Sequence, residues 1–202
     1  MKFMEITTLS VGAFEENASV MAFDNGSAWI VDPGADAERI AAVLDAQHLA
    51  PAAILLTHGH FDHICAIADL QGKYGEVPVY IHAADKIMLG HAWNQFPPQY
   101  PIQPPPKNLH SGEWPQGVDV IETPGHTPGS VSFYFKDAGV VLTGDTLFAG
   151  SAGRTDFPGG SFAALKRSLA VLAKLPPATR VIPGHGNDTT IERELATNPF
   201  YN

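Results

Sequence analysis

One seven-residue stretch, THGHFDH at residues 57–63, limits what this chain can fold into more than any other. It holds three histidines and an aspartate, and it begins where the apolar run AAILLT (52–57), a predicted buried strand, ends. Imidazole and carboxylate groups crowded into one loop suit a metal ion far better than a hydrophobic core. The end of a strand is a usual place for chemistry in an α/β sheet, so the stretch predicts a metal site at a sheet edge.

The spacing within the loop indicates more than one ion. His58 and His60 are two residues apart, so in an extended segment both rings point the same way and can reach one ion. Asp62 and His63 follow where the chain turns into a helix, so they can face a second ion beside the first. Imidazole and carboxylate ligands suit zinc, iron or manganese.

Three further candidate ligands lie in other loops. Each is a polar residue at the tip of a predicted apolar strand, in a turn bounded by glycine or proline: His126 in TPGHTPG, Asp145 in LTGDT and His185 in VIPGHG. A surface histidine would not need such placement, and a core histidine would not recur in turns. The recurrence predicts that these residues complete the site.

Short runs of strand-forming residues alternate with helical periods along the whole chain. The expected strands are 3–9, 17–23, 28–32, 52–57, 77–82, 118–123, 130–135, 139–144 and 179–183, and the expected helices are 36–48, a segment carrying Ile64 to Leu70, 161–175 and 188–196. Asn-Gly in DNGS (24–27) predicts a hairpin, and Ser161 predicts a helix N-cap. Strands grouped with helices in each half favour an α/β fold in which two sheets pack together with helices outside.

Residues 91–116 are rich in proline and show little periodicity. Loops of this length are uncommon in compact domains and are often lids, so a lid or site wall and a surface linker both stay open. Trp93, Phe96 and Tyr100 could wall a pocket, and packing of the loop on itself explains them equally well.

Length and charge narrow the remaining possibilities. With 202 residues, 45% of them hydrophobic, residues 1–202 are expected to form a single domain. The net charge of −9 and the lack of a basic stripe argue against a nucleic-acid partner. The N-terminus lacks the apolar stretch of a secretory signal, and no apolar run reaches membrane-spanning length, so a cytoplasmic protein without a membrane partner is expected. The sequence gives no prediction of oligomeric state.

The motifs HGHFDH, PGHTPG, GDT and PGHG, in this order, resemble the metallo-β-lactamase superfamily. The stretches GDTLFAGSAGRTDFPGG (144–160) and PGHGNDTTIERELATNPF (183–200) are similar to short, single-domain bacterial members of its glyoxalase II group, the hydroxyacylglutathione hydrolases. The resemblance covers nearly the whole chain. It implies an αββα sandwich, in which two mixed sheets pack face to face with helices outside and the site lies along one edge.

The resemblance also implies a ligand set for two divalent metal ions, zinc first, with iron and manganese as alternatives. By resemblance, His58, His60 and His126 would hold the first ion, Asp62, His63 and His185 would hold the second, and Asp145 would bridge them.

The implied activity is hydrolysis of a small-molecule thioester such as S-lactoylglutathione by a metal-bridging hydroxide. Two ions that share a water lower its pKa toward ~7, so hydroxide forms at neutral pH. Asp62 would ligate a metal and could also handle a proton after the attack. Arg154, in SAGRTD, stands where the resemblance places a basic residue that grips a substrate carboxylate through its fork of donors. An ion pair with Asp156 is the alternative role for Arg154.

Three other functions are weighed against thioester hydrolysis. A persulfide dioxygenase would use a single iron on His58, His126 and Asp145. A β-lactamase is disfavoured because Asp145 stands where many such enzymes have a cysteine. A non-catalytic metal-binding domain is disfavoured by the complete set of seven ligands. The exact substrate, recognition of glutathione and the metal's identity stay open.

Overall fold

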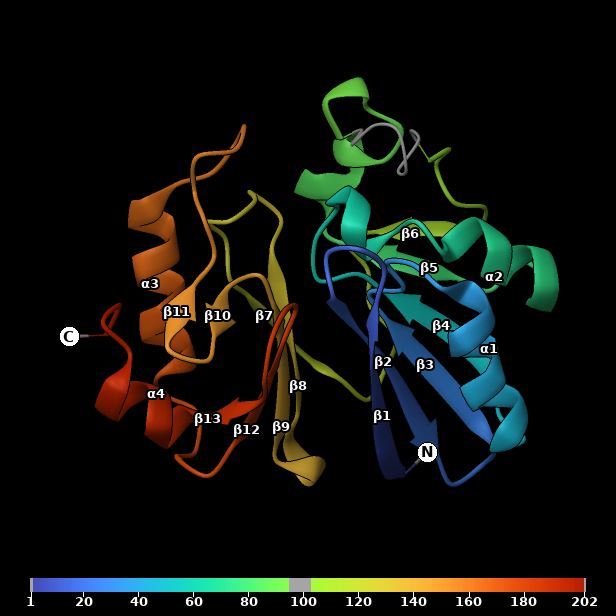
Figure 1. The fold of residues 1–202 in the computed structure, drawn as a ribbon, viewed down its shortest axis with the longest axis horizontal. Helices are drawn as coiled ribbons and strands as arrows, with labels where there is room; N and C mark the ends of the chain where they lie inside the picture. The colour runs from blue at the N-terminus through green and yellow to red at the C-terminus, as the bar shows by residue number, and fades with distance from the viewer. Residues whose placement is uncertain (1, 95–102, 202) are drawn as a thin grey trace. The chain divides into compact units, whose positions relative to one another are not determined.

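The structure is a computed structural model, and it describes residues 2–94 and 103–201. The chain divides into two compact units, Met1–Pro115 and Gln116–Asn202, which are coloured blue to green and yellow to red in Figure 1. Each unit holds its own sheet and helices. The expectation of a single domain over residues 1–202 stays a prediction.

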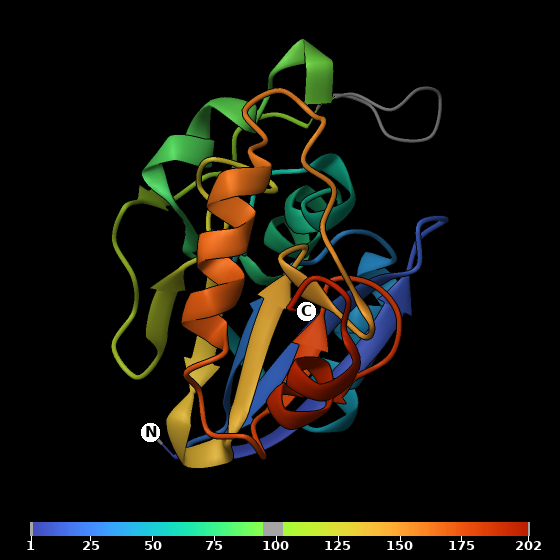
Figure 2. The same cartoon turned by 90° about the vertical axis from the view of Figure 1, so that its left-hand side faces the viewer.

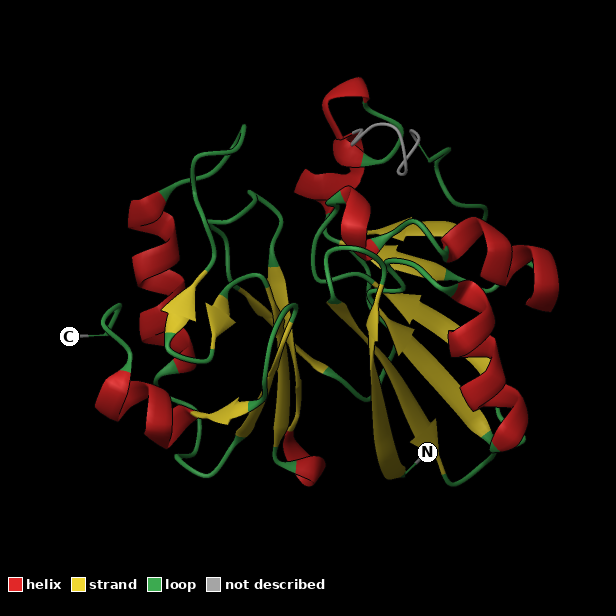
Figure 3. Ribbon diagram, viewed as in Figure 1, coloured by secondary structure: helices red, strands yellow, loops and turns green. Residues whose placement is uncertain are grey.

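Unit 1 is built on a six-stranded mixed sheet. The first three strands pair antiparallel and the following pairs are parallel, and the strands lie side by side in chain order (Figure 1). Figure 3 draws the strands in yellow. Their bounds are β1 Phe3–Val11, β2 Glu16–Phe23, β3 Ser27–Val31, β4 Ala50–Leu55, β5 Val79–Ile81 and β6 Leu109–Ser111. The Asn-Gly hairpin is confirmed, because β2 and β3 pair on either side of that turn.

Two helices cover one face of this sheet, α1 (Ala37–Ala46) and α2 (Ile67–Tyr74). Each turns an apolar stripe toward the sheet, which places Ile40, Leu44 and Leu70 in the same core as the strands. Three short 3-10 segments complete the unit: η1 Phe61–His63, η2 Ala83–Met88 and η3 Ala92–Asn94.

Unit 2 is built on a five-stranded mixed sheet in the order β13-β12-β9-β8-β7. Only β9 and β12 pair in parallel. The elements are β7 Asp119–Glu122, β8 Val131–Phe135, η4 Lys136–Ala138, β9 Val140–Gly144, the small hairpin β10 Leu147–Phe148 and β11 Ser151–Ala152, α3 Phe162–Leu172, β12 Arg180–Pro183, β13 Thr189–Thr190 and α4 Ile191–Thr197. Helix α3 lies along the sheet in Figure 2 and packs Leu165 and Leu169 against Val141 and Val181.

Several expected boundaries are confirmed and others are wrong. Ser161 caps α3 by accepting the amide of Ala164, as predicted. The start of the last predicted helix is wrong, because Thr189 and Thr190 pair with β12 as a strand and α4 begins only at Ile191. Ile64 precedes α2, because the chain first makes the 3-10 turn η1.

In the described part of the proline-rich stretch 91–116, residues 109–111 form the strand β6, which was not specifically predicted from the sequence and which pairs in parallel with β5. The central part of the expected lid, residues 95–102 with Phe96 and Tyr100, lies outside the described residues. Over the two described ranges, no helix combines the length and the apolar character that crossing a membrane requires.

Candidate metal centre

The histidine loop of unit 1 directly follows β4, as predicted. His58, His60 and His63 are all buried, and Asp62 is partly exposed. The turn η1 separates the first two histidines from the third, since His60 is still extended and His63 lies at the end of η1. Three buried imidazoles within six residues form a concentrated set of metal donors.

Asp32, just past β3, fixes the geometry of this loop. Its Oδ1 accepts the amide of Thr57 at 2.7 Å, and its Oδ2 accepts the Thr57 hydroxyl at 2.6 Å and faces Nδ1 of His63 at 3.0 Å. A carboxylate can only accept, so Nδ1 of His63 is the protonated nitrogen. Nε2 of His63 is therefore left with its lone pair, as metal binding requires.

The same hydrogen bonds set the tautomer of His58. Its Nδ1 lies 3.1 Å from the Thr57 hydroxyl oxygen. That hydroxyl already donates its hydrogen to Asp32, so it accepts from Nδ1 of His58. One buried aspartate thus orients two imidazoles, and in both rings Nε2 is the nitrogen that could ligate a metal.

Asp32 could also be read as a ligand, because one of its oxygens lies within 4.8 Å of donor atoms of His58 and His63. Its oxygens, however, already accept the amide and hydroxyl of Thr57 and the ring N–H of His63. A carboxylate that orients ligand histidines by hydrogen bonds is typical of the layer of residues around a metal site. Asp32 is therefore a positioning residue.

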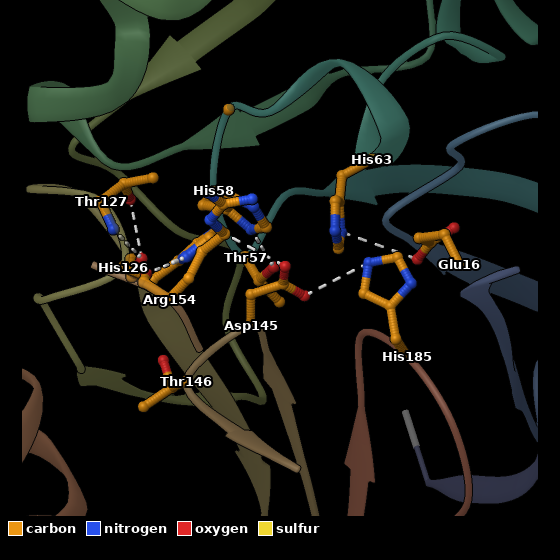
Figure 4. A network of polar contacts seen from close by, with 12 residues as sticks. Glu16, Thr57, His58, His63, His126, Thr127, Asp145, Thr146, Arg154 and His185 are labelled. Atoms are coloured by element: carbon orange, nitrogen blue, oxygen red, sulfur yellow. Dashed lines mark hydrogen bonds and ion pairs between the residues drawn. The ribbon is translucent and has the colours of Figure 1, made fainter. Parts of the chain in front are cut away.

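A second buried carboxylate, Glu16 at the start of β2, approaches the same ring. Its Oε1 lies 3.7 Å from Nδ1 of His63, and the pair is drawn in Figure 4. Gly34 permits this packing, because a Cβ there would lie 1.6 Å from the Asp62 carbonyl oxygen and 2.8 Å from Glu16 Oε2. Any larger residue at position 34 would push the loop away.

The backbone of the loop is held by two more buried polar side chains. Asp85 accepts the amide of Gly59 at 3.2 Å. Asn94 accepts the amide of Phe61 at 3.0 Å and donates to the carbonyls of Gly59 at 2.6 Å and Met88 at 3.1 Å. The segment 83–94 therefore fixes the peptide groups that lie between the ligand side chains.

In unit 2, His126 lies in a tight turn that is hydrogen-bonded to α3 and to its N-cap, Ser161. Ser168 donates to the carbonyl of Pro124 at 2.7 Å, and the amide of Ser161 donates to that of Gly125 at 2.8 Å. Nδ1 of His126 lies 2.8 Å from the carbonyl oxygen of Arg154. A carbonyl only accepts, so Nδ1 carries the hydrogen and Nε2 is the nitrogen that could ligate a metal.

Asp145, just after β9, lies between two histidines of its own unit. Its Oδ2 is 3.4 Å from Nε2 of His126 and its Oδ1 is 3.6 Å from Nε2 of His185. Figure 4 draws the three side chains. With Nδ1 of His126 committed to a carbonyl, Nε2 is the nitrogen that faces this carboxylate, so an ion bound between them would have a ligand on each side. The donor set and its spacing therefore fit bound metal ions.

The loop after Asp145 places Arg154 beside this set. A Cβ at Gly153 would lie 1.8 Å from the Asp145 carbonyl oxygen, so only glycine lets the two backbones meet. The Arg154 guanidinium donates to both oxygens of Asp156, at 2.7 and 2.6 Å, which forms the ion pair considered from the sequence. This hydrogen bonding lowers the pKa of Asp156 to about 2. The role of Arg154 in binding substrate stays a prediction.

The predicted ligands thus fall into two groups within the two units. His58, His60, Asp62 and His63 share one loop of unit 1, and His126, Asp145 and His185 gather in unit 2. Asp32, Glu16, Asp85 and Asn94 were not predicted. Of these, only Asp32 left a sequence signal, as the last residue before Pro-Gly at a strand end in VDPG. Burial raises the pKa of the Cys65 thiol to about 12, which leaves it neutral.

Relatives match this chain in sequence over nearly their full length. The chain is 38% identical to the probable metallo-hydrolase YqgX of Bacillus subtilis over 209 residues, which is 98% of each protein. It is 34% identical to the hydroxyacylglutathione hydrolase GloC of Haemophilus influenzae, over 98% of this chain and 99% of that protein.

Solved structures agree with the fold. The B3 metallo-β-lactamase BLEG-1 superposes with a TM-score of 0.90 at 37% identity, covering 98% of this chain and all of that one. TTHA1623, solved in a di-iron-bound form, superposes with a TM-score of 0.83 at 40% identity, covering 96% and 99%. Two mixed sheets with helices are therefore confirmed as the metallo-β-lactamase fold. The model of the metallo-beta-lactamase superfamily matches residues 11–185, and the chain belongs to that superfamily.

Proposed function

We propose that this protein is a dinuclear metal-dependent hydrolase that cleaves a thioester such as S-lactoylglutathione. The observation that carries the proposal is the placement of Asp145, whose two oxygens face Nε2 of two different histidines. A carboxylate that joins two ions needs this arrangement, with one imidazole on each side.

The proposed ligand sets are those implied by the motifs. His58, His60 and His126 hold one ion, Asp62, His63 and His185 hold the other, and Asp145 is shared. The hydrogen bonds of His58, His63 and His126 support the proposal, since each commits Nδ1 and leaves Nε2 for a metal. The di-iron form of TTHA1623 supports a two-ion site on this fold. Zinc, iron and manganese are all compatible with these donors.

Two bound ions would supply a polarised carbonyl and a water of lowered pKa. Residues of the chain orient the metal ligands and accept the proton. Asp32 and the Arg154 carbonyl hold the rings of His63 and His126 in one tautomer, so that no reorganisation is needed during the reaction. Asp62 is partly exposed, and in this proposal its carboxylate also takes up a proton from the attacking water.

The choice of a thioester rests on the relative GloC, a hydroxyacylglutathione hydrolase, and on Arg154 as the residue that would bind a substrate carboxylate. Release of a thiolate also suits this site, since a thiolate is a good leaving group that needs no general acid. No nucleophilic side chain is required.

A second candidate is β-lactam hydrolysis. It is favoured by one observation, the similarity to BLEG-1 at 37% identity and a TM-score of 0.90. Both reactions attack a carbonyl, and they differ in the bond that breaks, C–S or a strained C–N.

A substrate panel on one sample tests the proposal. The purified protein is assayed with S-lactoylglutathione, an uncharged thioester, a chromogenic cephalosporin and glutathione persulfide, and its metal content is measured. Thiol release from the thioesters with about two ions per chain is the expected result. Lactam opening without thiol release would favour the second candidate, and oxygen uptake with the persulfide would favour a dioxygenase.

A further inference from the structure

Three neighbouring side chains in the loop after Asp145 form one compact cluster. Arg154 donates Nε and one NH2 nitrogen to the two oxygens of Asp156, and its guanidinium lies 4.1 Å from the centre of the Phe157 ring. All three side chains are solvent-accessible: Arg154 is 58% exposed, Asp156 66% and Phe157 40%. The Arg154 guanidinium is hydrogen-bonded through two of its nitrogens and lies against an aromatic ring, so it has little conformational freedom.

This cluster adjoins the proposed metal ligands of unit 2. The Arg154 carbonyl fixes His126, and the Phe157 ring centre lies 6.4 Å from that of His126. A substrate group reaching past His126 therefore meets the guanidinium and the phenyl ring. Arg154 is the cation that the proposed function assigns to a substrate carboxylate.

Asp156 accepts two hydrogen bonds from the Arg154 guanidinium, in the same geometry that a substrate carboxylate would use. A planar guanidinium presents one such pair of parallel donors on this side, formed by Nε and the neighbouring nitrogen. A carboxylate of the substrate that uses this edge must displace Asp156 or share its donors. Asp156 also adds a negative charge to a protein of net charge −9, which further disfavours an anion.

We propose that Asp156 is a specificity-determining residue, which competes with the carboxylate of an anionic thioester for the Arg154 fork and so favours thioesters with an uncharged thiol portion. The inference rests on the proposed function. It predicts that removing the Asp156 carboxylate strengthens the binding of an anionic thioester. If the ion pair were purely structural, its removal would leave the preference between anionic and uncharged thioesters unchanged.

The kinetic test compares two substrates that differ in the thiol portion. S-lactoylglutathione carries carboxylates and S-lactoyl-N-acetylcysteamine carries none. Asp156→Asn is expected to raise the ratio of their kcat/KM values roughly two- to fivefold in favour of the glutathione ester, the size of an exposed ion pair. The change should lie in KM, and added salt should reduce it.

Two control variants isolate the cause. Asp45→Asn removes the same charge from an exposed ion pair with Lys73 in unit 1 and should leave the ratio unchanged. In an Arg154→Ala background, adding Asp156→Asn should not change the ratio further, because the guanidinium for which Asp156 and the substrate compete is absent. A ratio that Asp156→Asn leaves unchanged, or that it raises equally without Arg154, would overturn the inference.

A binding measurement separates this inference from the proposed reaction. S-methylglutathione cannot be hydrolysed as a thioester, and its Kd for the metal-loaded protein is measured by calorimetry. Asp156→Asn should tighten that Kd by the same two- to fivefold factor. Tighter binding without turnover of any thioester would sink the proposed function and keep Asp156 as a selectivity residue. Equal Kd values, or no binding by either protein, would sink the inference.

Discussion

At the scale of single residues, Asp32 shows how one buried carboxylate can define a metal-binding loop. It accepts from Thr57 and from His63, which lie 25 and 31 residues further along the chain. The motifs in the sequence identify the histidines but not this partner, because its role depends on a fold that brings distant residues together. Its backbone adopts φ 48°, in the left-handed region, where aspartate is tolerated better than most residues.

Asp32→Asn tests this role. An asparagine has one acceptor oxygen where Asp32 uses two, so either the Thr57 amide or Nδ1 of His63 loses its acceptor. The loop is then no longer held in this arrangement, and we expect metal affinity to fall about 10- to 100-fold. Competition with a chromophoric chelator measures the affinity. Asp24→Asn, in an exposed turn of the same unit, is the matched control. Equal affinities for both variants and the unchanged protein would show that Asp32 does not position the ligand.

Tyr201 provides a test through pH. Burial, with a smaller contribution from Glu194, raises its pKa to about 12. A pKa above the ordinary value of about 10 means that folding favours the neutral phenol, so this stability is fully present below pH ~10 and is lost as the pH rises toward 12. We expect the free energy of unfolding to fall by on the order of 1–2 kcal/mol more in the unchanged protein than in Tyr201→Phe over this window. Parallel curves for the two proteins, from denaturant titrations at pH 9 to 11.5, would contradict this.

At the scale of elements, strands and helices with long apolar patterns were predictable from the sequence, and some of the shortest strands were not. The hairpin at Asn25-Gly26 and the Ser161 cap follow from local turn and cap chemistry. Strands of two or three residues, such as β6 and β13, exist because a neighbouring strand offers hydrogen bonds, and their own residues carry too little signal. The turn η1 displaced the start of α2 for a similar reason, since the packing of the loop against Asp85 and Asn94 decides its course.

Asn94→Ala tests whether the segment 83–94 holds the histidine loop. The change leaves the buried amide of Phe61 and carbonyl of Gly59 without their side-chain partner, so we expect a loss of about 1–3 kcal/mol in the free energy of unfolding. Urea denaturation of the metal-free proteins gives this value without a contribution from bound ions. Gln47→Ala removes an exposed amide in the same unit and should change stability by less than about 0.5 kcal/mol.

At the scale of the whole molecule, the coarse architecture was predictable and confirmed as two mixed sheets with helices in the metallo-β-lactamase fold. Four loops at strand ends carry the candidate ligands. These loops were recognisable in the sequence because glycine and proline residues lie beside the ligands. Of the polar residues that hold these loops, Asp32 precedes Pro-Gly, whereas Glu16, Asp85 and Asn94 carry no such mark. The acidic, histidine-rich composition admits several metals, and the donor set alone does not select one.

Removing the metal should weaken the whole protein if the proposed ions take ligands from both units. We expect chelation to lower Tm by several degrees and an added divalent ion to restore it, because a ligand that binds only the folded state stabilises it by mass action. Asp145→Asn should bind fewer ions and respond less, while Asp188→Asn, which loses an exposed ion pair with Arg180, should respond like the unchanged protein. Thermal scans that are indifferent to chelator would argue against structural participation of the ions.

The close approach of backbones at Gly34 and Gly153 has a consequence for mutational surveys of this protein. At each position a single methyl group would overlap a carbonyl oxygen of Asp62 or Asp145. A survey that scores activity alone would rank both glycines with the most sensitive positions, although neither has a side chain to offer a substrate. Abundance measured alongside turnover would sort such steric positions from the chemically active ones.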